Sequence, residues 1–119
     1  MAVIPYVLIE QVENSASTNG TISVAWPDMQ SGDVGQPYSG HSYADRSIQV
    51  VGVFSAATCR VAGSNGGDTY TALSDPQGDA LNLATAGLKA VSEITRFLRP
   101  EVLGGDGATS LTVTMIARR

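Results

Sequence analysis

Side chains of catalytic type are few and scattered in this sequence. The single histidine, His41, lies in a glycine-rich stretch with Tyr43 and Asp45 nearby. A hydrolytic triad or a metal site would need more ligands converging from elsewhere, and the sequence has no second histidine. No serine stands in a Gly-x-Ser-x-Gly elbow. We therefore interpret His41 as a solvated loop residue and predict that the chain is not an enzyme.

The glycine-rich turn at residues 63–68 is the second place where ligand chemistry is conceivable. Asn65 and Asp68 offer oxygens that suit calcium, but the alternating ligand spacing of an EF-hand loop is absent. The turn also lacks the Lys-Ser/Thr pair of a phosphate-binding loop, and it joins two expected strands instead of opening a helix. Asn and Asp in such turns usually bond to neighbouring backbone groups. We expect neither a metal nor a cofactor here.

Cys59 and Arg99 have structural interpretations. Cys59 is the only cysteine, so the chain cannot form an internal disulfide, and its place on the apolar side of an expected strand favours a small buried side chain. Arg99 stands among apolar neighbours, which predicts an ion pair with a carboxylate. The candidate partners are Glu101, Glu93 and Asp106.

Three aromatic residues allow two interpretations. Trp26, Tyr38 and Tyr43 would form a sugar-binding platform if they lay together on an exposed face. The alternative is that Trp26 ends a strand and packs in the core, because large aromatic side chains are mostly buried. We favour the core interpretation and keep a carbohydrate-binding module as an alternative function.

Composition limits the partners. The chain has 119 residues, enough for one domain with a single core. Only 15% of the residues are charged, and the net charge is −4, which repels phosphate backbones and argues against nucleic acid. No apolar run approaches the roughly 20 residues that span a bilayer. The N-terminal stretch lacks the basic residues of a signal peptide. We expect no membrane association, and a surface of Ser, Thr, Gly, Asn and Gln suits an assembly.

Residues 47–78 hold the strongest strand signal. Polar and apolar residues alternate around Ile48, around Cys59 and again around Tyr70, which is the two-residue period of a strand. The turn at residues 63–68 separates the second and third of these runs. This arrangement predicts a β-hairpin.

The remainder of the chain also favours strands. We expect short strands at residues 21–26, 81–85 and 96–103, the last with Pro100 marking an edge or a bulge. Residues 84–94 are predicted to be a loop or a single turn. The final strand has an apolar face formed by Leu111, Val113, Met115 and Ala117. Seven or eight short strands are typical of an antiparallel β-sandwich or jelly roll.

The two ends of the chain differ in regularity. Residues 2–12 are apolar with Pro5 inside, which suits an edge strand or an extended arm. Residues 28–42 show little periodicity and read as a long loop of the kind that is ordered on a partner. We therefore divide the single domain into an N-terminal arm and loop segment, residues 1–45, and a sandwich core, residues 46–119.

Residues 55–119 resemble the small head proteins of tailed bacteriophages. The resemblance covers a little over half of the chain and consists of turns and core positions. Its elements are Gly63-Ser64-Asn65, Tyr70, the Leu-Ser-Asp-Pro-Gln-Gly turn at 73–78, Phe97 to Pro100, and Gly104 to Asp106. The sequence departs from the pattern at two points, with Gly66-Gly67-Asp68 where Asp-Gly is usual and Tyr70 where tryptophan is common.

This resemblance implies a capsid decoration or cement protein. Such a β-sandwich sits on the outside of the head, often as a homotrimer, and clamps neighbouring subunits of the major capsid protein. The implied location is the virion, after synthesis in the host cytoplasm. A tail or baseplate component and the coat protein of a small shell remain as further alternatives.

Overall fold

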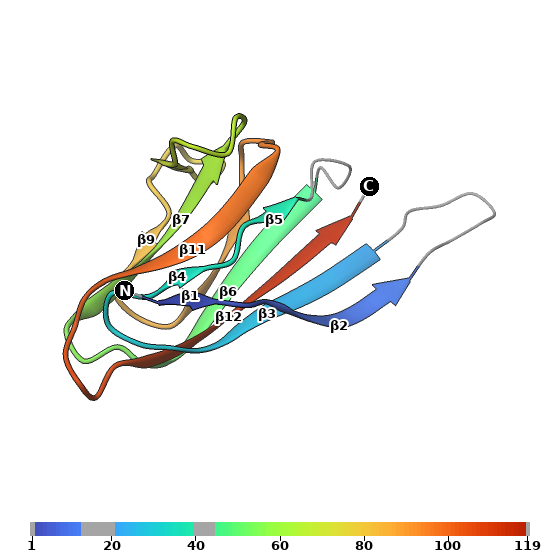
Figure 1. The fold of residues 1–119 in the computed structure, drawn as a ribbon. Helices are drawn as coiled ribbons and strands as arrows, with labels where there is room; N and C mark the ends of the chain where they lie inside the picture. The colour runs from blue at the N-terminus through green and yellow to red at the C-terminus, as the bar shows by residue number, and fades with distance from the viewer. Residues whose placement is uncertain (1, 13–20, 40–44, 119) are drawn as a thin grey trace.

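Two β-sheets packed face to face form the molecule (Figure 1). The computed structural model describes residues 2–12, 21–39 and 45–118. All regular structure in these residues is strand, which confirms the predicted all-β sandwich. The strands are β1 (Val3–Ile4), β2 (Val7–Val12), β3 (Thr21–Met29), β4 (Val34–Gly35), β5 (Tyr38–Ser39), β6 (Asp45–Val53), β7 (Ala57–Ser64), β8 (Thr71–Ala72), β9 (Asn82–Leu83), β10 (Gly87–Val91), β11 (Phe97–Gly104) and β12 (Ser110–Arg118).

The five-stranded sheet has the order β10-β6-β12-β3-β2, and all its neighbours are antiparallel. β12 lies at its centre, with Met115 opposite Ile48 of β6 and Val24 of β3. All three side chains are fully buried, because the two-residue period places alternate residues on the inner face. The predicted apolar face of the final strand is thereby confirmed; its buried members are Leu111, Val113, Met115 and Ala117.

The other sheet has the order β1-β4-β11-β7-β8, with β5 also paired to β11 and β9 to β7. The predicted hairpin is confirmed, since β7 and β8 are antiparallel and place Ala62 opposite Ala72. A turn is also present within the Leu-Ser-Asp-Pro-Gln-Gly segment at 73–78: the Gly78 amide donates to the Asp75 carbonyl at 2.9 Å. The Asp75 carboxylate accepts two more backbone N–H groups, which stabilises this turn.

Pro100 occupies an interior strand, so the prediction that it marks an edge or a bulge is wrong. β11 pairs with β7 on one side, with Pro100 opposite Val61, and with β4 and β5 on the other. Those two short strands are separate: β4 ends at Gly35 and β5 begins at Tyr38. Because proline has no N–H to donate, the ladder is interrupted beside it.

The Trp26 side chain reaches across the core to this interruption. Its Nε1–H donates to the Gln36 carbonyl at 2.9 Å, and the ring is fully buried. Gly35 makes room for it, since a Cβ there would lie 2.6 Å from Pro100 Cδ and 2.7 Å from Trp26 Cδ1. One hydrogen bond and close packing therefore tie the five-stranded sheet to the other sheet at this point.

Strands are present in two segments that were expected to lack them, the described part of residues 28–42 and residues 84–94, and the strand expected at residues 21–26 is confirmed as part of β3. β3 pairs with both β2 and β12, and β4 and β5 pair with β11, so residues 21–39 belong to the sandwich. The interpretation of the first 45 residues as lying outside the core is wrong for this part. β10 lies within residues 84–94, and Lys89 stands opposite Ile48. The apolar alternation of β10 is weak because the strand lies at a sheet edge and buries few of its side chains.

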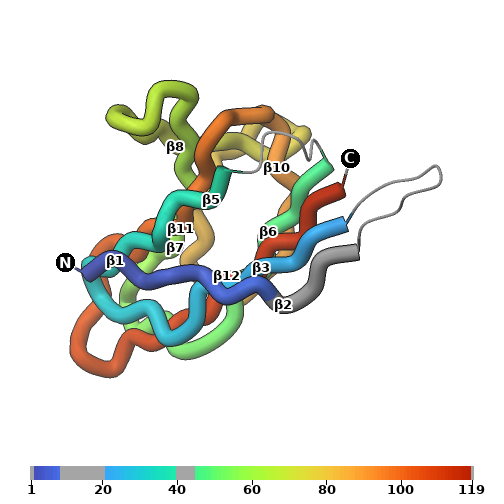
Figure 2. The backbone as a smooth tube through the Cα atoms, turned by 45° about the vertical axis from the view of Figure 1, so that its right-hand side comes forward, coloured from blue at the N-terminus to red at the C-terminus, as the bar shows by residue number. Residues whose placement is uncertain are grey.

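Residues 2–12 form a strap along one open side of the sandwich. β1 pairs in parallel with β4 of one sheet, and β2 pairs with β3 of the other (Figure 2). Between them, Tyr6 packs edge-on against Trp26 and Tyr38, with ring centroids 6.2 and 5.2 Å apart. The predicted extended N-terminal arm thus lies against the core and joins both sheets.

The contact at Gly35 predicts a stability effect. Gly35→Ala should lower the free energy of unfolding by about 1–3 kcal/mol, because the new methyl group clashes with Pro100 and Trp26. Gly66→Ala is the matched control, since a Cβ there meets nothing within 4 Å. Urea unfolding of both variants checks the prediction. Equal stability of the two would contradict the packing described here.

Candidate functional site

The residues first considered for catalysis do not form a site in the described part of the chain. His41 and Tyr43 lie outside the described residues. Asp45 is engaged in an ion pair, its Oδ2 lying 2.6 Å from Arg118 Nη2. Among residues 2–12, 21–39 and 45–118, no three His, Cys, Asp or Glu side chains lie together as a possible metal site. The same residues contain no helix long and apolar enough to cross a membrane.

The glycine-rich turn is held by its own polar groups. Asn65 Oδ1 accepts the Arg96 amide at 3.2 Å, and Ser64 Oγ accepts the Gly67 amide at 2.8 Å. Asp68 is exposed. The Ser64 bond is local, whereas Asn65 bonds a backbone amide 31 residues away and not the neighbouring group that the sequence suggested.

The aromatic residues do not make a sugar platform. Trp26 and Tyr38 are both buried, so the alternative of an exposed platform is wrong for these two residues, and the favoured core interpretation of Trp26 is confirmed. Tyr43 lies outside the described residues. The Tyr6 ring packs edge-on against the rings of Trp26 and Tyr38, and these contacts hold the strap against the core.

The outer face of the sheet that contains β7 and β11 carries a charged network. Arg99 pairs with Glu101, one of its three predicted partners, with Nε donating to Oε2 at 2.9 Å. Arg60 Nε donates to the other carboxylate oxygen at 2.8 Å. The Arg99 guanidinium also stacks 3.9 Å from the centre of the Tyr70 ring. Sequence reasoning missed Arg60 and Tyr70, although Arg60 and Glu101 stand opposite each other once β7 and β11 are paired.

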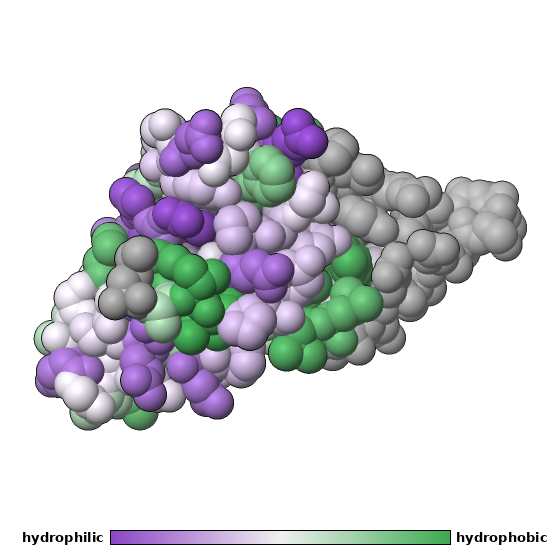
Figure 3. Space-filling model, in the orientation of Figure 1, coloured by the Kyte–Doolittle hydropathy of each residue, from purple (hydrophilic) through white to green (hydrophobic). Residues whose placement is uncertain are grey.

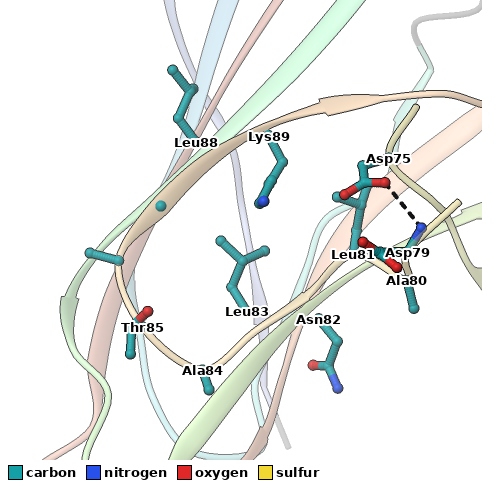
Figure 4. Close-up of a pocket in the computed structure, with 12 residues that line it drawn as sticks. Asp75, Asp79, Ala80, Leu81, Asn82, Leu83, Ala84, Thr85, Leu88 and Lys89 are labelled. Carbon is teal, nitrogen blue, oxygen red and sulfur yellow. Dashed lines mark hydrogen bonds between the residues drawn. The ribbon is translucent and has the colours of Figure 1, made fainter. Parts of the chain in front are cut away.

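A groove of about 510 Å³ separates β9 from β10 (Figure 4). Lys89 points into it beside Leu83, and the Asp75 carboxylate is turned toward the amide of Asp79 (Figure 4). The groove is otherwise lined mainly by small and apolar residues of the 80–88 segment. Its ionic side chains are Lys89, Asp75 and Asp79.

Exposed apolar side chains are the remaining surface feature. On the strap, Val3 and Leu8 are 58% and 49% exposed, and Figure 3 shows hydrophobic surface over β1 and β2. A second group lies on the outer face of the five-stranded sheet; its exposed members are Val7, Val51, Val53, Leu88 and Ile116. The chemistry that these surfaces support is burial against another macromolecule.

The fold defines a β-sandwich whose strand pairs are antiparallel except for β1 with β4, and one solved structure shares it. No protein-family model matches the sequence, and no curated protein matches it. The solved SPBc2 prophage-derived protein YomS is similar in structure, with a TM-score of 0.70 over 90% of this chain and 100% of that chain, at 15% identity. Fe(II)-HppE with the alternative substrate (S)-1-HPP has a TM-score of 0.46, at 14% identity, over 94% of this chain and 49% of that chain. The YomS likeness shows a shared fold, and the HppE likeness is too distant to support an argument.

Cys59 is predicted to be unreactive in the folded protein. Its side chain is fully buried, and burial, followed by the negative charge of Glu101, raises the pKa of the thiol to about 12. We expect a thiol reagent at pH 8 to label Cys59 only as fast as the protein unfolds; rapid labelling of native protein would contradict this. The unfolded thiol ionises near 9.0. The contribution of this group to stability is therefore present below pH 9.0 and lost as the pH rises toward 12.

The network around Glu101 predicts a second stability effect. Glu101→Gln should lower the free energy of unfolding by about 1–3 kcal/mol, because two partly buried guanidinium groups lose their carboxylate. Asp45→Asn is the control, since its pair with Arg118 is exposed and should matter by less than about 1 kcal/mol. Urea unfolding measures both. A larger loss in the control would refute this ranking.

Proposed function

We propose that this chain is a structural protein of a phage particle, a decoration protein that binds the outside of a tailed-phage head. Its role is to add contacts between neighbouring subunits of the major capsid protein, and it acts as a homotrimer. The observation that carries the proposal is the strap, which presents exposed apolar side chains on a strand that both sheets hold in place. The fold shared with the prophage-derived YomS over that protein's full length supports it.

The strap has two properties of a docking element. β2 is the last strand of its sheet, so one of its edges is open to a further strand from a partner. Val3 and Leu8 add apolar area beside that edge. The strap is also fixed before binding: the Val34 and Gln36 amides donate to the carbonyls of Ala2 and Ile4 at 2.9 and 2.8 Å. A pre-ordered contact loses less entropy on binding.

Because a phage head offers many identical binding sites, a small contact for each copy is sufficient for stable binding. The copies of a decoration protein meet a shell with many identical sites, and joined copies bind with avidity. The strap therefore needs to supply only a small apolar contact for each copy.

Co-sedimentation with heads tests the proposal. Purified chain is mixed with empty heads and, separately, with tails of the phage or prophage that encodes it. We expect the chain to sediment with heads and to raise the temperature at which they come apart. Binding to tails alone would favour a tail or baseplate component, and binding to neither would overturn the proposal.

The strap predicts which substitutions weaken this binding. Val3→Ser together with Leu8→Ser should reduce affinity for heads about tenfold or more, because two apolar side chains lose their burial in the contact. Ile94→Ser is the control, since Ile94 is 56% exposed but lies in the connection after β10. Binding isotherms of the three proteins to heads measure the effect. Equal weakening by the control would argue against the strap.

A further inference from the structure

The outer face of the five-stranded sheet bears an uncharged row across all of its strands. Strand register places Leu88 opposite Gln49, Gln49 opposite Thr114, Thr114 opposite Ala25, and Ala25 opposite Val7. Residues directly opposite each other in antiparallel strands share a face. The row therefore runs from β10 to β2 with no ionic side chain.

The rows beside it have the same character. Ile116 stands between Ser23 and Ser47, and Thr112 stands opposite Val51. Leu88, Val51 and Ile116 are 62%, 44% and 51% exposed. Charge enters this face at its ends, at one of which Asp45 and Arg118 neutralise each other. Two acidic residues also border it: the exposed Asp28, whose amide donates to Thr112 Oγ1, and Glu10, which strand register places opposite Ser23.

The other sheet presents a contrasting outer face. There, Arg60 and Arg99 flank the buried Glu101 at the centre of the sheet, and Leu103 is exposed beside them. A solvated antiparallel sheet normally places polar and charged residues outward. A sheet face of Val, Ile, Leu, Ala, Ser and Thr, with large apolar side chains left exposed, is typical of an interaction surface.

We infer that the outer face of the five-stranded sheet is the surface through which copies of this chain associate with one another. The inference rests on the proposed function, to which it adds the contact between copies. The chain carries a net charge of −4, and like charges brought together at an interface are costly. Two copies limit this cost by meeting through the central row, which has no ionic side chain. A partner selected by opposite charge would have nothing to recognise there.

The size of the face agrees with this role. Its three longest strands have nine residues each, and β2 and β10 have six and five. At about 3.3 Å per residue and about 4.8 Å between strands, the face covers about 600 Å² in projection, which reaches the lower bound for one side of a specific interface.

Charge placed at the centre of the row tests the inference. Thr114→Arg should raise the dissociation constant for self-association at least about 100-fold, because arginines of adjoining copies are brought together without a counter-ion. Thr58→Arg, on the outer face of the other sheet opposite Leu103, is the matched control. Sedimentation velocity over a range of concentrations gives the mass of each protein. We expect oligomers for the wild type and the control, and a single chain for Thr114→Arg.

Two further measurements keep the result decisive. If Thr114→Arg does not fold, Leu88→Lys adds charge to the same row at an exposed position of an edge strand and should also weaken association. A wild-type protein that is a single chain at every concentration, or a charged variant that folds and associates unchanged, would overturn the inference. Head binding is scored separately: an oligomeric wild type that ignores heads would refute the proposed function and leave this inference standing.

Discussion

The hydrogen bond from the Trp26 indole to the Gln36 carbonyl is the interaction on which the described structure depends. It joins the five-stranded sheet to the other sheet at the point where Pro100 cannot donate to the ladder. Because Gly35 has no Cβ, the Trp26 and Pro100 side chains can both pack against it, and Tyr6 of the strap packs against Trp26. The N-terminal strap is consequently held by the core, and its apolar side faces outward.

The outer faces of the two sheets differ in their charge. On the outer face of the sheet that contains β11, Arg60 and Arg99 both form ion pairs with Glu101. The five-stranded sheet has an uncharged row across the centre of its outer face, and the strap leaves Val3 and Leu8 exposed. A chain with these surfaces is suited to making contacts, and the proposed roles of the strap and of the sheet face assign one kind of contact to each.

Sequence patterns predicted those parts of the fold whose signal is local. The alternation around Ile48 and Met115 gave buried strand faces, and the turn residues at 75–78 formed the expected turn. The same patterns could not predict features that depend on pairing between strands far apart in the sequence. The short strands beside Pro100 follow from pairing with β11, and β10 is a strand because β6 offers it an edge. Arg99 was assigned a carboxylate partner correctly, whereas Arg60 joined it only through the register of two strands.

Our central proposal is that this protein binds a phage head and catalyses no reaction. A cryo-electron microscopy reconstruction of the particle that carries this chain tests it most directly. The account predicts sandwich-shaped density on the outside of the head, with the strap toward the shell and the five-stranded sheets of neighbouring copies facing one another. Density confined to the tail, or a head surface that meets the chain through the Arg60–Glu101 face, would contradict it.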